Sequence, residues 1–301
     1  MMRAACVIGL GSMGYGAAIS LLRAGFDVRG VDRNSVALER FRAAGGTTAA
    51  TPAEGVRGAE TAFIFVVDAN QTDEVLFGAS GAAPALAPGS IVVACATVPP
   101  AFVEKLAQRL AEMNILMLDA PVSGGSAKAA AGEMTIMAAG AAEAFSKAEP
   151  FLRAIASKVY RLGDMPGAGS RVKMINQLLA GAHIAAAAEA MALGLKLGLD
   201  PHQLYEVIAN SAGSSWMFQN RVPHILAGDY TPRSAIDIFV KDLGIVLEAG
   251  EALDFPVPIA EAAHRQFAAA SAKGLGREDD AAVIKVYAEA AQVDLPPRRA
   301  G

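Results

Sequence analysis

Cysteine is nearly absent from the 301-residue chain: Cys6 and Cys95 are the only two, and both lie in apolar, strand-like runs. Two such isolated cysteines do not make the disulfide framework that is typical of small secreted domains. The first residues also lack the layout of a cleavable signal, because a single arginine is followed directly by a strand-like run and a glycine loop. We therefore expect a protein of the reducing cytoplasm.

An excess of positive charge is missing as well. The chain has 26 lysines and arginines against 30 aspartates and glutamates, which gives a net charge of −4. Without a strong positive field, contact with a nucleic acid would release few phosphate counterions. We expect no general nucleic-acid binding.

Uninterrupted apolar runs and clusters of metal-binding side chains are also lacking. The longest apolar stretch, residues 180–195, is interrupted by His183 and Glu189, whereas a membrane span needs about 18 or more apolar residues in a row. We expect a buried helix there. The four histidines show neither HExxH nor clustered spacing, and no nucleophile–histidine arrangement stands out. These absences argue against a membrane protein, a metalloenzyme and a hydrolase.

Apolar residues are abundant, and in the first half they follow a strand–helix alternation. Hydrophobic residues make up 53% of the chain, enough for one large or two medium cores. Strands are predicted at 3–9, 27–32, 61–67, 91–94, 115–119 and 135–139, with helices at 14–24, 36–43 and 100–113. Such alternation is typical of an α/β fold with a doubly wound parallel sheet. We assign this domain to residues 1–165.

The remaining residues, 166–301, change character. Strand-like runs stop, and the segment GDMPGAGS supplies the glycine and proline expected at a domain boundary. A long helix is predicted at 170–198, and further helices are predicted at 201–209, 236–252, 256–273 and 281–290. We expect an all-α domain whose long, largely apolar helix is covered by other helices or by a second subunit.

A glycine-rich loop, Gly9-Leu10-Gly11-Ser12-Met13-Gly14, follows the first predicted strand and opens the first predicted helix. In this G-x-G-x-x-G spacing, the first glycine permits the tight turn and the second lets the backbone approach a pyrophosphate. The third allows close helix–strand packing. Glycines at such turns also serve packing alone, but the strand–turn–helix context favours a dinucleotide site.

Asp32 closes the second predicted strand, 18 positions after Gly14. A carboxylate at this point accepts hydrogen bonds from the adenosine ribose and repels a 2′-phosphate, which favours NAD as the cofactor. The alternative is that Asp32 only caps the next helix. Arg33 beside it can pair with a phosphate, so NADP stays open.

Ser123, Gly124 and Gly125 follow the predicted strand 115–119. The carboxyl ends of parallel strands are where such sheets bind ligands. A serine hydroxyl with two glycine amides makes a small nest suited to a carboxylate. An ordinary turn is the alternative.

Lys173 lies near the start of the long predicted helix, and Asn176 and Gln177, three and four residues further on, flank the same face. A helical lysine is usually solvated. Here the neighbours are strongly apolar, and the helix starts where the predicted dinucleotide domain ends. Burial would lower the pKa of Lys173 from about 10.4 and suit its amine to general acid–base catalysis.

Five motifs together resemble one family, the β-hydroxyacid dehydrogenases: IGLGSMG, CATVPP, DAPVSGG, GAGSRVKMINQ and FVKDL. The family includes 3-hydroxyisobutyrate dehydrogenase, tartronate semialdehyde reductase and, more distantly, 6-phosphogluconate dehydrogenase. The motifs span nearly the whole chain in the family's order. The resemblance implies a Rossmann-like N-terminal domain, an all-helical C-terminal domain, and a homodimer or homotetramer formed through the helical domain. It also implies NAD(P)-dependent oxidation of a small hydroxycarboxylate.

Residue by residue, the resemblance makes Lys173 the catalytic lysine and Asn176 the asparagine that helps to position it and the substrate. The substrate carboxylate corresponds to Ser123–Gly125. Thr97, in CATVPP, lies near the nicotinamide in the family, and Lys241, in FVKDL, approaches the cofactor or substrate.

Gln177 departs from the family, since several relatives have a second asparagine there; which of Asn176 and Gln177 contacts substrate stays open. The segments SSWMFQNRVPHIL and GDYTPRSAIDIFVKDLGIV most resemble the branch that oxidises four-carbon sugar acids such as L-threonate. Ser214, Ser215, Trp216 and Arg221 are pocket-lining candidates. Alternatives are activity on 3-hydroxyisobutyrate or tartronate semialdehyde, an NADPH-dependent imine or keto reductase, and a non-catalytic dinucleotide-binding assembly module.

Overall fold

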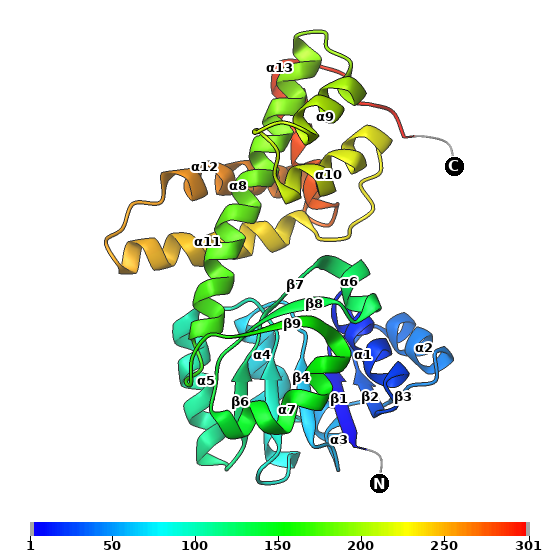
Figure 1. Cartoon of the computed structure of the whole chain (residues 1–301), viewed down its shortest axis with the longest axis vertical. Coiled ribbons are helices and arrows are strands. Elements are labelled where there is room, and N and C mark those ends of the chain that lie inside the picture. Colours follow the sequence, from blue (N-terminus) through cyan, green and yellow to red (C-terminus); the bar gives the residue numbers. More distant parts are fainter. Residues whose placement is uncertain (1–2, 299–301) are drawn as a thin grey trace. The chain divides into compact units, whose positions relative to one another are not determined.

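The computed structural model describes residues 3–298, and its contacts divide the chain into two compact units. We call Met1–Lys173 the N-terminal unit and Met174–Gly301 the helical unit. Each is described by itself below, with the element labels of Figure 1.

The N-terminal unit is built on a six-stranded sheet with the strand order β3-β2-β1-β4-β5-β6. All of its pairings are parallel. Its strands are β1 (Ala4–Ile8), β2 (Asp27–Val31), β3 (Thr47–Thr48), β4 (Thr61–Ile64), β5 (Ile91–Ala94) and β6 (Leu116–Asp119). The strand order reverses beside β1, which pairs with β2 on one side and with β4 on the other.

Both faces of this sheet are covered. Along β1, Ala5 and Val7 belong to one buried apolar cluster while Cys6 and Ile8 belong to another, as alternation of side chains along a strand requires. The first cluster includes residues of α1 and α7, and the second includes residues of α4 and α5. The helices of the unit are α1 (Gly14–Arg23), α2 (Ser35–Ala43), α3 (Pro52–Gly55), α4 (Ala69–Phe77), η1 (Ala83–Ala85), α5 (Pro100–Glu112), α6 (Gly125–Ala131) and α7 (Ala142–Ile155). The predicted doubly wound α/β architecture is confirmed (Figure 1).

A second, three-stranded sheet lies beyond β6 and corrects one expectation. Strand β8 (Met134–Ala138) pairs antiparallel with β7 (Val122–Ser123) and parallel with β9 (Ala156–Arg161). The expectation that residues 135–139 belong to the parallel sheet is therefore wrong. The chain turns back after β6, so that Asp119 and Ala139 form an isolated antiparallel bridge.

The helical unit consists of most of the long helix α8 (Ala168–Lys196) and the helices that follow it. These are α9 (Pro201–Ala209), α10 (Trp216–Ala227), α11 (Ile236–Ala252), α12 (Pro258–Ala270), the π-helical turn η2 (Ser271–Leu275), the 3₁₀ helix η3 (Asp280–Val283) and α13 (Ile284–Ala291). The predicted helices at 201–209 and 236–252 are confirmed to the residue. The helix predicted at 256–273 starts two residues later and becomes π-helical at Ser271, before Gly274 with a φ of +82°.

Helix α8 is long and apolar enough to cross a membrane by length and composition alone, with 44% of its most apolar window buried. A core helix of a soluble protein passes the same test. Six of its residues from Ile184 to Ala192 belong to the buried apolar cluster of the helical unit. We therefore interpret α8 as a core helix of the helical unit.

Candidate active site

The glycine loop between β1 and α1 contains glycines of two kinds. A Cβ on Gly9, whose φ is +94°, would lie 2.5 Å from the carbonyl oxygen of Phe65, and one on Gly14 would lie 1.9 Å from that of Gly9. Both glycines are thus required by the chain's own packing. Gly11 is exposed, and a Cβ there would meet nothing within 4 Å. Its small size leaves space above the loop that no protein atom fills, which fits the close approach of a pyrophosphate.

Asp32 follows β2 directly and supports this loop from the side. Its Oδ2 accepts a hydrogen bond from the backbone N–H of Leu10 at 2.6 Å, and its Oδ1 accepts one from that of Asn34 at 2.8 Å. The cap of α2 is Asn34, whose side chain accepts from Val36 N–H, so capping is not the role of Asp32. Each carboxylate oxygen has a second lone pair, so Asp32 can still accept from ribose hydroxyls. Arg33 beside it is exposed.

Thr97 and Ser123 lie after strands of the same unit. Thr97 comes three residues after the end of β5, and Ser123 ends β7, four residues after the end of β6. Gly124 and Gly125 have φ values of +129° and +74°, which residues with a side chain rarely adopt. A Cβ on Gly125 would meet nothing within 4 Å. The turn after Ser123 therefore offers bare backbone at Gly125, as a carboxylate nest requires, while the Lys128 side chain packs against Gly124.

The start of α8 is fixed to the end of β6 by one buried carboxylate. Asp119 Oδ2 accepts from the backbone N–H groups of Gly167 and Ser170, both at 2.8 Å, and Oδ1 accepts from Ser170 Oγ at 2.7 Å. Burial raises the pKa of Asp119, and the hydrogen bonds from Ser170 and Gly167 oppose this rise. A Cβ on Gly169 would lie 2.3 Å from the carbonyl oxygen of Met137, so the helix start also packs closely.

Lys173 follows Ser170 by three residues, so it lies on the same face of α8. The lysine is only 7% exposed. Because Asp119 fixes Ser170, the backbone at Lys173 holds a set position relative to the carboxyl edge of β6. Lys173 is thus buried, as the sequence predicts.

Past Lys173, α8 carries two amides that join a charged pair on α11. Gln177 Nε2 donates to Asp242 Oδ2 at 2.5 Å, and Asn176 Nδ2 donates to Gln177 Oε1 at 3.0 Å. Lys241 Nζ lies 2.6 Å from the other oxygen of Asp242. The structure thus joins Asn176 and Gln177 to Lys241, which was predicted from a different segment of the sequence. The shared carboxylate, Asp242, was missed, although a charged residue next to Leu243 in an apolar helix was the available signal.

Two of the pocket-lining candidates predicted around Trp216 contact other side chains or backbone groups of this unit. Ser215 caps α10 by accepting from the N–H of Phe218 at 3.0 Å. Arg221 forms an ion pair with the fully buried Asp280. The helix α10 itself was not predicted. These contacts account for Ser215 and Arg221 without a ligand.

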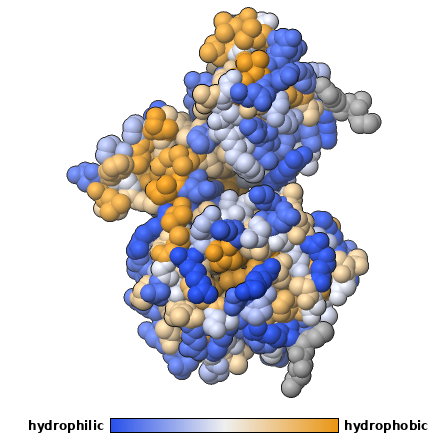
Figure 2. Space-filling view, in the orientation of Figure 1, coloured by the Kyte–Doolittle hydropathy of each residue, from blue (hydrophilic) through white to orange (hydrophobic). Residues whose placement is uncertain are grey.

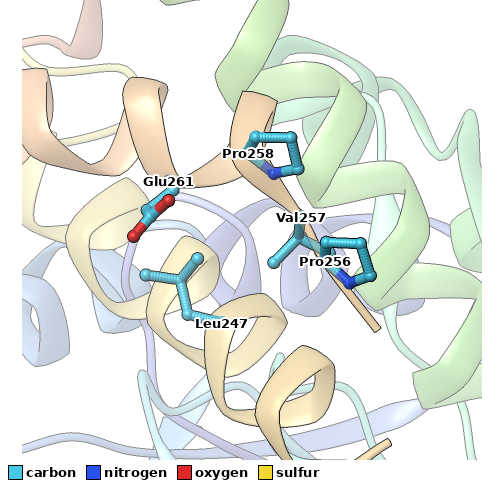
Figure 3. A pocket seen from close by; sticks show the side chains of 5 residues that line it. All are labelled: Leu247, Pro256, Val257, Pro258 and Glu261. Atoms are coloured by element: carbon cyan, nitrogen blue, oxygen red, sulfur yellow. The ribbon is translucent and has the colours of Figure 1, made fainter. Parts of the chain in front are cut away.

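A hollow of about 340 Å³ lies elsewhere in the helical unit, between the end of α11 and the start of α12 (Figure 3). It is lined by Leu247, Pro256, Val257, Pro258 and Glu261. None of the predicted site residues borders it, and Glu261 is its one charged side chain. Its walls offer no set of converging polar groups for a hydroxycarboxylate.

Comparison with known proteins agrees with this description in both units. Residues 4–163 match the NAD-binding domain of 6-phosphogluconate dehydrogenase, and residues 167–287 match the NAD-binding family of NADP-dependent 3-hydroxyisobutyrate dehydrogenase. The chain is 62% identical to L-threonate dehydrogenase of Cupriavidus necator over 93% of this chain and 95% of that protein. It is 50% identical to L-threonate dehydrogenase of Escherichia coli K12 over 93% of each.

A crystal structure with a similar fold is that of 3-hydroxyisobutyrate dehydrogenase from Salmonella typhimurium. It is 50% identical in sequence, and the match covers 94% of this chain and 99% of that one with a TM-score of 0.90.

Proposed function

The chain belongs to the 3-hydroxyisobutyrate dehydrogenase family of NAD(P)-dependent oxidoreductases that act on CH–OH groups, and we propose that its substrate is a four-carbon sugar acid such as L-threonate, oxidised to the oxo acid. The observation that carries the proposed reaction type is Lys173, a buried amine on a helix start that Asp119 fixes to the sheet edge. The relatives named L-threonate dehydrogenase, at 50–62% identity, supply the substrate class.

The cofactor is NAD, with NADP as the alternative. We propose that its pyrophosphate lies along Gly9–Gly14 and that Asp32 accepts from the adenosine ribose, with Arg33 beside it. Thr97 and Lys241 complete the proposed cofactor contacts. The open space above Gly11 and the remaining acceptor capacity of Asp32 support this assignment. In domain terms, residues 1–165 bind the dinucleotide and residues 166–301 contribute to substrate binding and assembly.

The proposed chemistry divides between proton and hydride. When bound, NAD supplies the acceptor for the hydride that leaves the carbinol carbon. Lys173, as the neutral amine, accepts the proton of the substrate hydroxyl, and in the reverse direction its ammonium returns that proton to the carbonyl oxygen. Asn176 orients the lysine and hydrogen-bonds the reacting groups, and its amide oxygen stabilises the ammonium that forms on Lys173. Ser123, Gly124 and Gly125 hold the substrate carboxylate. Gln177 accepts a hydrogen bond from Asn176.

The test is reduction of NAD and of NADP by a panel of hydroxy acids. L-threonate, D-erythronate, glycerate and 3-hydroxyisobutyrate are compared by kcat/KM from the absorbance of the reduced cofactor. We expect L-threonate with NAD to give the highest value. A higher value for 3-hydroxyisobutyrate or glycerate would contradict the four-carbon assignment. Cofactor binding without turnover of any hydroxy acid would favour a non-catalytic assembly module.

We also propose that the protein is a cytoplasmic homodimer or homotetramer that assembles through its helical part. Apolar side chains on α8 are exposed by roughly half or more, among them Ile175, Leu179 and Leu193. A second exposed apolar set, Leu253, Phe255 and Ile259, lies around the α11–α12 hairpin (Figure 2, orange). Light scattering coupled to size exclusion tests the proposal, because L179E would shift the mass toward the monomer while E149Q, on the exposed face of α7, would not.

A further inference from the structure

Asp242 lies at one end of a line of polar side chains whose other end, Asn176, is one turn from the proposed catalytic lysine. Asp242 is 1% exposed. Its carboxylate accepts a hydrogen bond from Gln177 at 2.5 Å, and Gln177 in turn accepts one from Asn176 at 3.0 Å. We propose that Asp242 is a positioning residue, which fixes the orientation of both amides and thereby keeps Asn176 Oδ1 as the atom presented to the reacting groups. This inference rests on the proposed function, in which Asn176 acts beside Lys173.

The chemistry of the donors and acceptors gives the line its direction. The two ends of an amide have nearly the same shape, so packing alone does not decide which end points where. A carboxylate only accepts, so Gln177 must turn its Nε2 toward Asp242. Its Oε1 then faces Asn176, which must turn Nδ2 toward it. The Oδ1 of Asn176 is left as an acceptor for the hydroxyl proton of the substrate or for the Lys173 ammonium.

Lys241 strengthens this direction. Its ammonium, which only donates, forms an ion pair with Asp242 Oδ1 at 2.6 Å, although the two are not aligned as a hydrogen bond. An amide at position 242 would therefore turn its oxygen to Lys241 and its nitrogen to Gln177. Both following amides would reverse, and Asn176 would present Nδ2 in place of Oδ1. Asp242 and Gln177 are buried and Asn176 is half-buried, so the reversal is passed on from one hydrogen bond to the next.

The first test is D242N, which preserves shape and removes the carboxylate. We expect kcat to fall about 10–100-fold, as for other residues that orient a reacting group through one hydrogen bond. The KM for NAD should change less than about twofold. A donor in place of an acceptor next to Lys173 disfavours its ammonium, so the acid limb of the kcat–pH profile should move to lower pH. A residue with a purely structural role would not move that limb.

The second test exchanges the two groups. In the double variant D242N/Q177E, the amide placed on α11 donates to the carboxylate placed on α8. That carboxylate again accepts from Asn176, so the original orientation of Asn176 returns. We expect this variant to recover kcat to within about fivefold of the wild type. Q177E alone brings two carboxylates together and should be as impaired as D242N. A double variant no more active than the poorer single variant, or a D242N enzyme with wild-type kcat and pH profile, would overturn the proposal.

Two controls complete the design. Urea unfolding checks that each variant folds. If D242N proves unstable, Q177M takes its place as the test. It interrupts the same line of hydrogen bonds but keeps the Lys241–Asp242 pair, and its kcat should also fall. K173R tests the proposed function separately. A K173R enzyme with full activity would contradict the chemistry of Lys173, whereas inactive K173R with fully active D242N and Q177M would contradict the inference about Asp242 alone.

Discussion

The two units bury charged side chains in different places. In the described part of the N-terminal unit, the buried charged residues are Asp119 and Lys173, which lie beside and on the start of α8. In the helical unit, as far as residue 298, the buried acidic residues are Asp242, Asp279 and Asp280, and of these only Asp242 contacts the candidate site. His224 Nδ1 lies 2.9 Å from Asp279, and Arg221 pairs with Asp280, so these groups tie α10 to η3. Buried charge in the N-terminal unit therefore gathers at the start of α8, where we propose the chemistry, whereas in the helical unit most of it joins helices to one another.

The largest expected effect tests the first half of this comparison. K173A should lower kcat about 10²–10⁴-fold, because the group that takes the hydroxyl proton is lost. K173R should be similarly impaired, since a guanidinium keeps the charge but does not lose its proton near neutral pH. Calorimetric titration should still detect NAD binding to both variants. A kcat of K173A near that of the wild type would remove Lys173 from the chemistry.

The second prediction concerns charge with an architectural role. R221M should lower the free energy of unfolding by about 3–5 kcal/mol at pH 8, because Asp280 is left buried without its partner. The kcat of the folded fraction should not change. In the double variant R221M/D280L both charges are gone, and most of the stability should return. Urea unfolding measures both. A stable R221M, or one that folds and has lost activity, would contradict the comparison.

The pH dependence of the R221M deficit follows from Asp280. Burial raises the pKa of this carboxyl to about 6, even with Arg221 hydrogen-bonded to it. Because the folded-state value lies above the ordinary value of 3.8, the folded protein binds the proton more tightly. The contribution of Asp280 to stability therefore falls as the pH rises from about 4 through about 6. Without Arg221 the pKa of Asp280 rises further. The free energy of unfolding that R221M loses should therefore be largest at pH 8 and should become smaller toward pH 5.

Within the glycine loop, two glycines of the same motif should behave differently. G14A should lower the free energy of unfolding by about 2–3 kcal/mol, since the new methyl group would lie 1.9 Å from a backbone oxygen. G11A should leave stability within about 0.5 kcal/mol of the wild type and weaken NAD binding instead. Thermal unfolding and NAD titration separate the two outcomes. Equal NAD affinity in G11A and wild type would mean that the space above Gly11 is not the pyrophosphate site.

The smallest expected effect concerns cofactor choice. D32N keeps an acceptor for Leu10 N–H and removes the negative charge that repels a 2′-phosphate. NAD affinity should fall about tenfold, and the preference for NAD over NADP should narrow, since hydrogen bonds to charged groups are worth more than neutral ones. Titration with each cofactor gives the ratio. An unchanged ratio would contradict the ribose role of Asp32.

The sequence predicted the parallel sheet well because central strands buried on both faces appear as continuous apolar runs. It missed β9, whose residues Ala156–Arg161 are mostly exposed or half-buried and include the two basic residues Lys158 and Arg161. It missed α10, which starts after two serines and contains Pro223, features that indicate a loop. These are local signals that the surrounding structure overrides.

The candidate site could be predicted only where its residues fall in one short segment. The glycine loop follows from its spacing and its strand–turn–helix context, and the spacing of Lys173, Asn176 and Gln177 places them on one helix face. Asp119 and Asp242 act through partners 51 and 65 residues away along the chain, and one sequence contains no sign of which distant residue such a carboxylate meets. Similarly, the sequence did not predict that Arg221, a pocket-lining candidate, pairs with Asp280, which is 59 residues away along the chain.

The polar residues Ser170, Lys173, Asn176 and Gln177 recur at intervals of three and four along a single continuous helix. This spacing limits which insertions and deletions the chain can tolerate there. One residue added or deleted between Ser170 and Gln177 would rotate everything after it by about 100° around the helix axis. The amine would then leave the face that Ser170 marks, or the amides would leave Asp242. Loops between other elements can lengthen or shorten at little cost. This interval, in contrast, should keep the same length in every active member of the lineage.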